Sequence, residues 1–209
     1  MEKSKLSQSR MKLKLFNDSY DLTIDPAERD VLDVLEKSLP DTPIDITLGK
    51  LQEPTGHPEF IEILEYLGDN GHKLRYHTSG AIIGRNTDPR ATDILEATKK
   101  YCSQVILEYN PGKILDNASL ALKEIGIPSA LHIKVSNENI QELRGLDYPA
   151  VILSRAMDIN QKSKVSQEEW EKIKSEILKY EELKLPEHMW IKKGKLILTK
   201  NIYELWKKI

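Results

Sequence analysis

Apolar positions along the chain follow two alternating patterns. Short apolar runs predict strands, and the longer segments between them place apolar residues at helical spacing, as Phe60, Ile63, Leu64 and Leu67 do. Strands that alternate with helices through short connections require a parallel sheet covered by helices. The predicted strands are KLKLF (12–16), IDITL (44–48), KLRYH (73–77), QVILE (104–108), ALHIKV (130–135) and AVILS (150–154).

Signals near both ends of the chain complete the predicted organisation. Residues 1–10 are polar and predict a flexible N-terminus. Ser166 and Glu169 form a capping box that predicts a charged helix through about Leu183, and KLILT and NIYELWKKI predict a last strand and helix. We therefore expect one α/β domain over 11–185, with 186–209 as its C-terminal strand and helix extension. A doubly wound sheet and a partial (β/α)6 barrel both fit.

Composition excludes several classes of protein. Of 209 residues, 39% are hydrophobic and 31% charged, which is typical of a globular chain. The formal net charge of −2 disfavours broad capture of nucleic acid. Cys102 is the only cysteine, so one chain cannot form a disulfide or a cysteine-ligated iron–sulfur cluster, and we expect a buried structural thiol. We find neither an apolar run long enough to span a membrane nor a signal peptide, so we expect a cytoplasmic protein.

The stretch LGKLQEPTGHPEFIEILEYLGDNGHKLRYHTSG resembles the second βα unit of radical S-adenosylmethionine (SAM) enzymes. Glu53-Pro54 matches the second half of the family's Gly-Gly-Glu-Pro element, His57-Pro58 matches its helix start, and Thr78-Ser79-Gly80 stands where Thr-Asn-Gly is usual. ALHIKVSNENIQEL is similar to the fifth strand and the following helix. The resemblance covers roughly 13–154 and implies a partial (β/α)6 TIM-like barrel with a mainly parallel sheet.

Two departures from the family pattern bear on cofactors. The family's Cys-x3-Cys-x2-Cys motif follows its first strand, and the corresponding LFNDSYDLTID has no cysteine. Leu51-Gln52 also replaces the Gly-Gly whose backbone approaches the methionyl amine of S-adenosylmethionine in the family. We therefore predict a radical-SAM-like protein without an iron–sulfur cluster, and the S-adenosylmethionine binding that the resemblance implies is in doubt.

Polar residues at the carboxyl ends of the predicted strands form the candidate ligand site, because barrels place function at that end. Glu108 and Asn110 are expected on one strand face, and Lys50, Lys134 and Arg155 would attract an anion. We predict non-radical binding of a small anionic or nucleotide-like ligand, or of a protein partner. An internal ion network of Glu108, Lys134 and Arg155 is the structural alternative. The candidate residues are Lys50, Glu53, His77, Thr78, Ser79, Glu108, Asn110, Lys134 and Arg155.

Two other functions stay open. A metal-assisted or acid–base enzyme would use Glu53, His77, Glu108 and His132. His77, Glu108 and His132 are its candidate metal ligands, because imidazole and carboxylate groups from separate strands can converge on one ion. An interaction module would use the lysine-rich and aromatic tail HMWIKKGKLILTKNIYELWKKI to bind a protein or, less favoured, a nucleic acid. His72 is expected in a surface loop.

Overall fold

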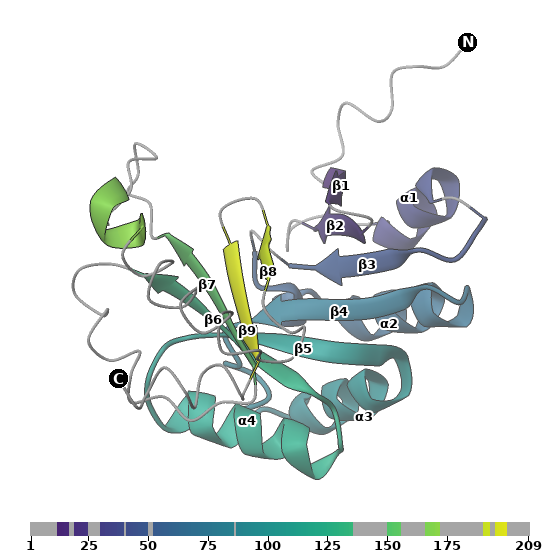
Figure 1. Ribbon diagram of the computed structural model, residues 1–209. Helices are drawn as coiled ribbons and strands as arrows, with labels where there is room; N and C mark the ends of the chain where they lie inside the picture. Colours follow the sequence, from purple (N-terminus) through teal and green to yellow (C-terminus); the bar gives the residue numbers. More distant parts are fainter. Residues whose placement is uncertain are drawn as a thin grey trace. The chain divides into compact units, whose positions relative to one another are not determined.

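Two compact units make up the chain, Met1–Ser129 and Ala130–Ile209. The structure is a computed structural model, drawn in Figure 1. The residues that the structure describes are 12–16, 19–24, 30–39, 41–49, 52–85, 87–135, 150–155, 166–171, 190–192 and 195–199.

A sheet with four parallel strands forms the centre of the first unit. Strands β2 to β5 pair in chain order, and β1 is added at the edge as an antiparallel partner of β2. The strands are β1 (Lys12–Phe16), β2 (Ser19–Thr23), β3 (Asp45–Leu48), β4 (Lys73–Thr78) and β5 (Cys102–Glu108).

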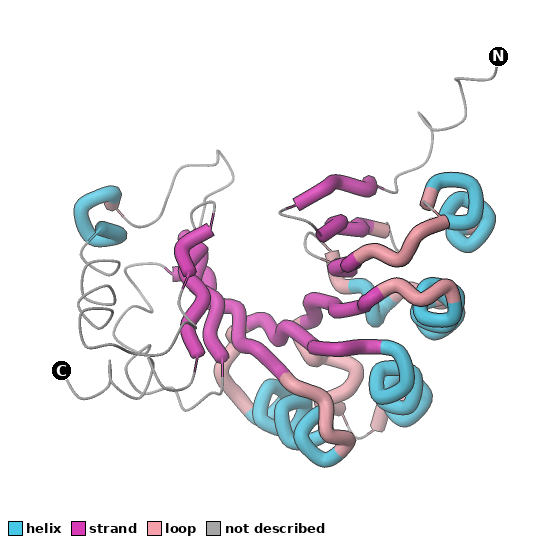
Figure 2. The backbone as a smooth tube through the Cα atoms, turned by 45° about the vertical axis from the view of Figure 1, so that its right-hand side comes forward, coloured by secondary structure: helices cyan, strands magenta, loops and turns pink. Residues whose placement is uncertain are grey.

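Helices connect these strands and lie along one face of the sheet (Figure 2). The prediction of an α/β chain with a mainly parallel sheet is confirmed, and the arrangement is consistent with a partial TIM-like barrel. The helices are α1 (Val31–Ser38), the 3₁₀ turn η1 (Pro54–Gly56), α2 (Phe60–Asp69), α3 (Ala91–Tyr101) and α4 (Lys113–Glu124).

Tyr76 fixes which face of β4 meets the helices. Its ring packs edge-on against Phe60 of α2, with centroids 5.2 Å apart, and its hydroxyl lies 2.9 Å from Thr98 Oγ1 of α3. Because successive strand residues point to opposite faces, Leu74 and Thr78 share this face, while Arg75 and His77 point to the face without helices. Apolar side chains such as Leu48 and Val105, in register with Tyr76, complete the core.

The only cysteine lies in this core at the start of β5. Its register with β4 shifts, because Leu74 pairs with Cys102 whereas Arg75 pairs with Gln104. The extra residue, Ser103, donates a hydrogen bond from its hydroxyl to the Leu74 carbonyl oxygen at 2.9 Å. Burial raises the pKa of the Cys102 thiol to about 12, so this cysteine is a structural residue, as expected.

Two glycines allow the segment after β4 to approach α4. A Cβ on Gly80 would lie 2.9 Å from the Ala118 Cβ, and one on Gly84 would overlap the Ile114 carbonyl oxygen. Asn117 of α4 donates a side-chain hydrogen bond to the Gly84 carbonyl oxygen at 3.2 Å. Larger residues at either glycine would therefore push this segment away from α4.

The second unit contains a parallel strand pair extended by a hairpin. Strand β6 pairs with β7 in parallel, β9 pairs antiparallel with β7, and β8 pairs antiparallel with β9. The predicted capping box is confirmed: Glu169 N–H donates to Ser166 Oγ at 3.1 Å, and Ser166 N–H donates to Glu169 Oε2 at 3.1 Å. The strands are β6 (Ser129–Val135), β7 (Ala150–Arg155), β8 (Trp190–Lys192) and β9 (Lys195–Thr199).

Some expectations need correction, and others lie outside the described residues. Strand β2 is absent from the predicted strands, because Tyr20 and Leu22 alternate with polar residues too briefly to stand out. His72 is buried rather than in a surface loop, because its ring lies against the start of β3.

The helix end near Leu183, the last predicted helix and the predicted flexible residues 1–10 lie outside the described residues. Within those residues, no helix has the length and apolar character needed to cross a membrane.

His72 makes the stability of the first unit depend on pH. Its Nδ1 accepts a hydrogen bond from Ile44 N–H at 3.2 Å, and burial lowers its pKa below the ordinary 6.5. The neutral ring therefore stabilises the fold fully above pH 6.5, and this stabilisation is lost as the pH falls through 6.5 toward the lower folded pKa. We expect the melting temperature of the unchanged protein to decrease when the pH is lowered from about 7.5 to about 5.

His72→Asn is the matched variant, because an amide oxygen can accept from Ile44 N–H without titrating. The difference in melting temperature between parent and variant should change across this pH range. A constant difference would contradict the role given to His72.

Candidate functional site

Glu53 holds together the carboxyl ends of β3 and β4. It lies in the loop after β3 and caps η1. Its Oε1 accepts hydrogen bonds from Thr55 N–H at 3.3 Å, Thr55 Oγ1 at 2.6 Å and Thr78 Oγ1 at 2.7 Å. Its Oε2 accepts from Ser79 N–H at 2.7 Å and Ser79 Oγ at 2.6 Å. We call Glu53, Thr55, Thr78 and Ser79 the Glu53 clamp.

Hydrogen bonds within the protein use the full accepting capacity of the Glu53 carboxylate. A carboxylate offers about four lone-pair sites, and Glu53 already accepts from five donors. Two clamp hydroxyl groups also accept hydrogen bonds from backbone N–H groups two residues later. Thr78 Oγ1 accepts from Gly80 N–H at 3.0 Å, and Ser79 Oγ accepts from Ala81 N–H at 3.3 Å. The backbone after β4 is therefore held by its own side chains, which gives the predicted ligand residues Glu53, Thr78 and Ser79 a positioning role.

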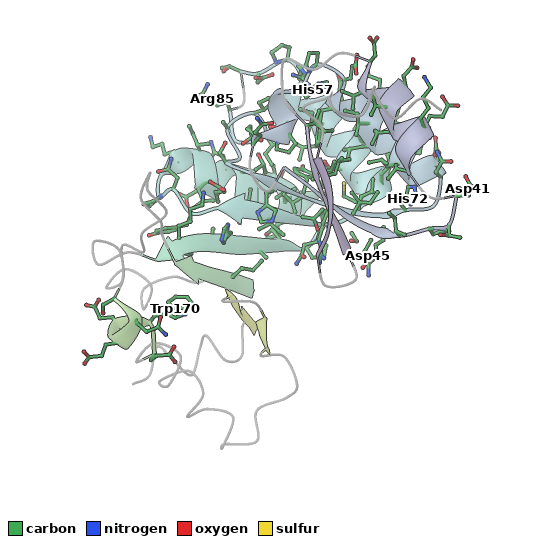
Figure 3. All side chains as sticks on the ribbon, turned by 90° about the horizontal axis from the view of Figure 1, so that it is seen from above. Asp41, Asp45, His57, His72, Arg85 and Trp170 are labelled. Carbon is green, nitrogen blue, oxygen red and sulfur yellow. The ribbon has the colours of Figure 1, made fainter. Side chains whose placement is uncertain are left out.

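A second connection joins the segment after η1 to the start of α3. Arg90 Nη2 donates to the His57 carbonyl oxygen at 2.7 Å, and Arg90 N–H donates to Asp88 Oδ1 at 3.0 Å. His57 Nδ1 accepts from Glu59 N–H at 3.1 Å just before α2. The expectation that His57 is a helix-start residue is confirmed, and Figure 3 labels it far from His72 and Asp45.

Polar side chains cross the helix-free face of the sheet on three neighbouring strands. The register of β3, β4 and β5 aligns Thr47, Arg75 and Gln104, which we call the polar row. Arg75 Nε donates to Thr47 Oγ1 at 2.7 Å, which shows that both side chains lie on this face. Parallel sheets are usually apolar on both faces, so a row with a guanidinium and an amide is unusual.

Two groups of the polar row, the Nη groups of Arg75 and the side-chain amide of Gln104, have no hydrogen-bond partner among the described residues. Arg75 and Gln104 are both half-buried. Among the described residues, the Nη groups of Arg75 and the side-chain amide of Gln104 make no hydrogen bond or ion pair. The row therefore presents hydrogen-bonding groups that the described protein does not itself use.

Other predicted residues of the first unit lie near the end of this face. His77 is buried and aligned with Ile106, and Glu108 is half-buried at the last position of β5. Asn110 is exposed two residues beyond β5, so the prediction that Glu108 and Asn110 share one strand face is wrong. The following Pro111 has no backbone N–H, which stops the strand pattern from continuing.

The remaining predicted residues do not join this geometry. In the second unit, His132 is buried and Lys134 is exposed on β6, while Arg155 is the last residue of β7. Lys50 and the side chain of Arg155 lie outside the described residues, so the predicted anion-binding set and the alternative ion network stay predictions. In the described part of the chain, no group of three His, Cys, Asp or Glu residues is arranged to hold a metal ion, which gives His77, Glu108 and His132 no support as ligands.

Arg75 is the residue that the sequence interpretation missed. KLRYH predicts a strand, and the predicted site contains the residues at the end of this strand rather than the arginine in its middle. The available signal was that arginine is seldom buried unless it is paired. Arg75 lies between Leu74 and Tyr76 in a strand that is expected to be central. Its position therefore predicts a buried arginine that needs a partner.

Comparison with known proteins gives distant structural similarity alone. No protein-family model and no curated protein matches the chain. A crystal structure of archaeal TYW1 matches with a TM-score of 0.48 and 8% identity, covering 75% of this chain and 57% of that chain. A structure of TYW1 with a lysine-pyruvate adduct bound matches with a TM-score of 0.44 and 11% identity, covering 81% and 63%.

This chain spans less than two thirds of the length of either structure. The absence of a cluster and the non-radical function stay predictions.

The clamp predicts a large effect of a small change at Glu53. In Glu53→Gln, an NH₂ group replaces one carboxylate oxygen and cannot accept the hydrogen bonds of either Ser79 or the two threonines. Because hydrogen bonds to a charged group contribute about 1.5–3 kcal/mol, we expect the free energy of unfolding to fall by about 2–3 kcal/mol, measured by urea denaturation.

Glu62→Gln is the control, because Glu62 is an exposed residue of α2. It should change the free energy of unfolding by less than about 0.5 kcal/mol. Equal effects of the two variants would show that the clamp does not stabilise the fold.

Proposed function

We propose that this chain binds a small anionic ligand, without radical chemistry, on the helix-free face of its first sheet. Arg75 would bind the anion, with Gln104 beside it. The observation that carries the proposal is the half-buried guanidinium of Arg75, whose Nη groups have no partner among the described residues. A charge that is withdrawn from water is costly unless another group compensates for it.

The hydrogen bond to Thr47 prepares Arg75 for this role. It occupies Nε and limits the rotation of the side chain, so the two Nη groups are left as the binding end of the guanidinium. Arginine binds carboxylate and phosphate through paired N–H groups in one plane, and a fixed fork loses less entropy on binding. The local geometry therefore suits an oxyanion better than a neutral ligand.

Gln104 extends the same site across the sheet. It is the register neighbour of Arg75, and adjacent strands are about 4.8 Å apart. Its amide can donate to an anion oxygen or accept from a hydroxyl group of the same ligand. The residues predicted at the strand ends have a supporting part in this proposal, because the Glu53 clamp holds the end of β4, the strand that carries Arg75.

No specific observation favours the interaction module or the metal-assisted enzyme. The interaction module depends on the tail, most of which lies outside the described residues, and the metal-assisted enzyme depends on ligands that no described group supplies. Ligand binding is the function that the described contacts favour, and catalysis is not part of the proposal.

Thermal stability with defined anions tests the proposal. We would measure the melting temperature of the full chain with phosphate, citrate, acetate or adenosine monophosphate, against chloride at the same ionic strength. A ligand that binds only the native state raises the melting temperature. We expect at least one anion to stabilise the parent protein and to lose at least about tenfold in affinity in Arg75→Gln, because a charged hydrogen bond contributes about 1.5–3 kcal/mol.

Arg85→Gln is the matched control, because Arg85 is an exposed arginine of the same unit (Figure 3). It should retain the stabilisation. An equal loss in both variants, or no stabilisation by any of the anions, would contradict the proposal. Circular dichroism of each variant separates lost binding from lost structure.

A further inference from the structure

A carboxylate stands close to the polar row on the same face. Asp45 precedes Thr47 by two residues on β3, so its side chain points to the helix-free face as well. It is half-buried, and the structure records no hydrogen bond or ion pair between its carboxylate and any described residue. The face therefore offers an anionic group as well as the guanidinium of Arg75.

Asp45 and Arg75 are near each other without forming an ion pair. They lie diagonally on adjacent strands, and strand spacing and rise place their Cβ atoms about 8 Å apart. Their charged ends are further apart than an ion pair allows. A carboxylate and a guanidinium that lie near each other without forming an ion pair are complementary to a small molecule that carries both a positive and a negative charge.

The charges around the polar row disfavour a strongly anionic ligand. A phosphate group bound at Arg75 would place up to two negative charges near the Asp45 carboxylate. The exposed Lys73, aligned with Asp45, is the other cation at this end of β4. The face is mixed in charge rather than positive.

We infer that the ligand is an amino-carboxylate whose carboxylate binds Arg75 and Gln104 and whose ammonium group binds Asp45. This inference depends on the proposed function, because it needs Arg75 to bind an anion. It replaces the nucleotide-like ligand with a smaller zwitterionic class, such as an amino acid. A positively charged nitrogen near Asp45 also compensates for the desolvation of that carboxylate.

Paired probes test the inference with the full chain. Each standard L-amino acid is compared with its deaminated carboxylic acid and with inorganic phosphate, by calorimetry or thermal shift. We expect at least one amino acid to bind at least about tenfold more tightly than its deaminated partner, because a charged hydrogen bond contributes about 1.5–3 kcal/mol. Asp45→Asn should abolish this preference and leave carboxylate binding through Arg75 intact.

Lys73→Gln is the matched control, since Lys73 is the register neighbour of Asp45 and is exposed. It should preserve the preference for the amino acid. A loss as large as that in Asp45→Asn would show that the preference is not specific to the Asp45 carboxylate, and would overturn the inference.

The remaining outcomes separate the two proposals. If phosphate or a deaminated acid binds as tightly as the amino acid, and Arg75→Gln abolishes that binding, the zwitterionic class is wrong and anion binding stands. If no probe binds in an Arg75-dependent way, both are wrong. Asp45 has no partner among the described residues, so Asp45→Asn should fold, and its melting temperature confirms this.

Discussion

The packing of Tyr76 between two helices decides how the first unit presents its chemistry. Its ring meets Phe60 and its hydroxyl meets Thr98, so the side of β4 that carries Tyr76 must face α2 and α3. Strand alternation then leaves Arg75 on the opposite face, and the parallel register places Thr47 and Gln104 beside it. A one-residue slip would exchange the buried phenol for a guanidinium, which the apolar core would not accept.

The Glu53 clamp and the polar row have separate roles, whereas the sequence predicts a single site at the strand ends. At the strand ends, a carboxylate and three hydroxyl-bearing residues satisfy one another and order the loops. Farther back on β4 and on the neighbouring β5, Arg75 and Gln104 keep hydrogen-bonding groups that no described residue uses. Satisfied polar groups give rigidity, whereas unsatisfied ones on a rigid frame are available for recognition.

Much of the fold could be predicted because its signals are local. Apolar runs located β3, β4 and β5 to within two residues, and the capping box at Ser166 formed as expected. A motif predicts a role for Glu53, but its partners Thr78 and Ser79 lie about 25 positions away, so the direction of its hydrogen bonds depends on tertiary structure. The polar row was harder to foresee, because the alignment of Thr47, Arg75 and Gln104 arises only when the strand register is known.

The buried thiol of Cys102 has a practical consequence for studying this chain. With its pKa near 12 and no other cysteine in the sequence, the protein should react slowly with thiol reagents at neutral pH. A cysteine introduced on the surface, for example in place of Arg85, would then be the favoured attachment point for a spectroscopic probe. The natural chain can therefore serve as its own background for site-directed labelling.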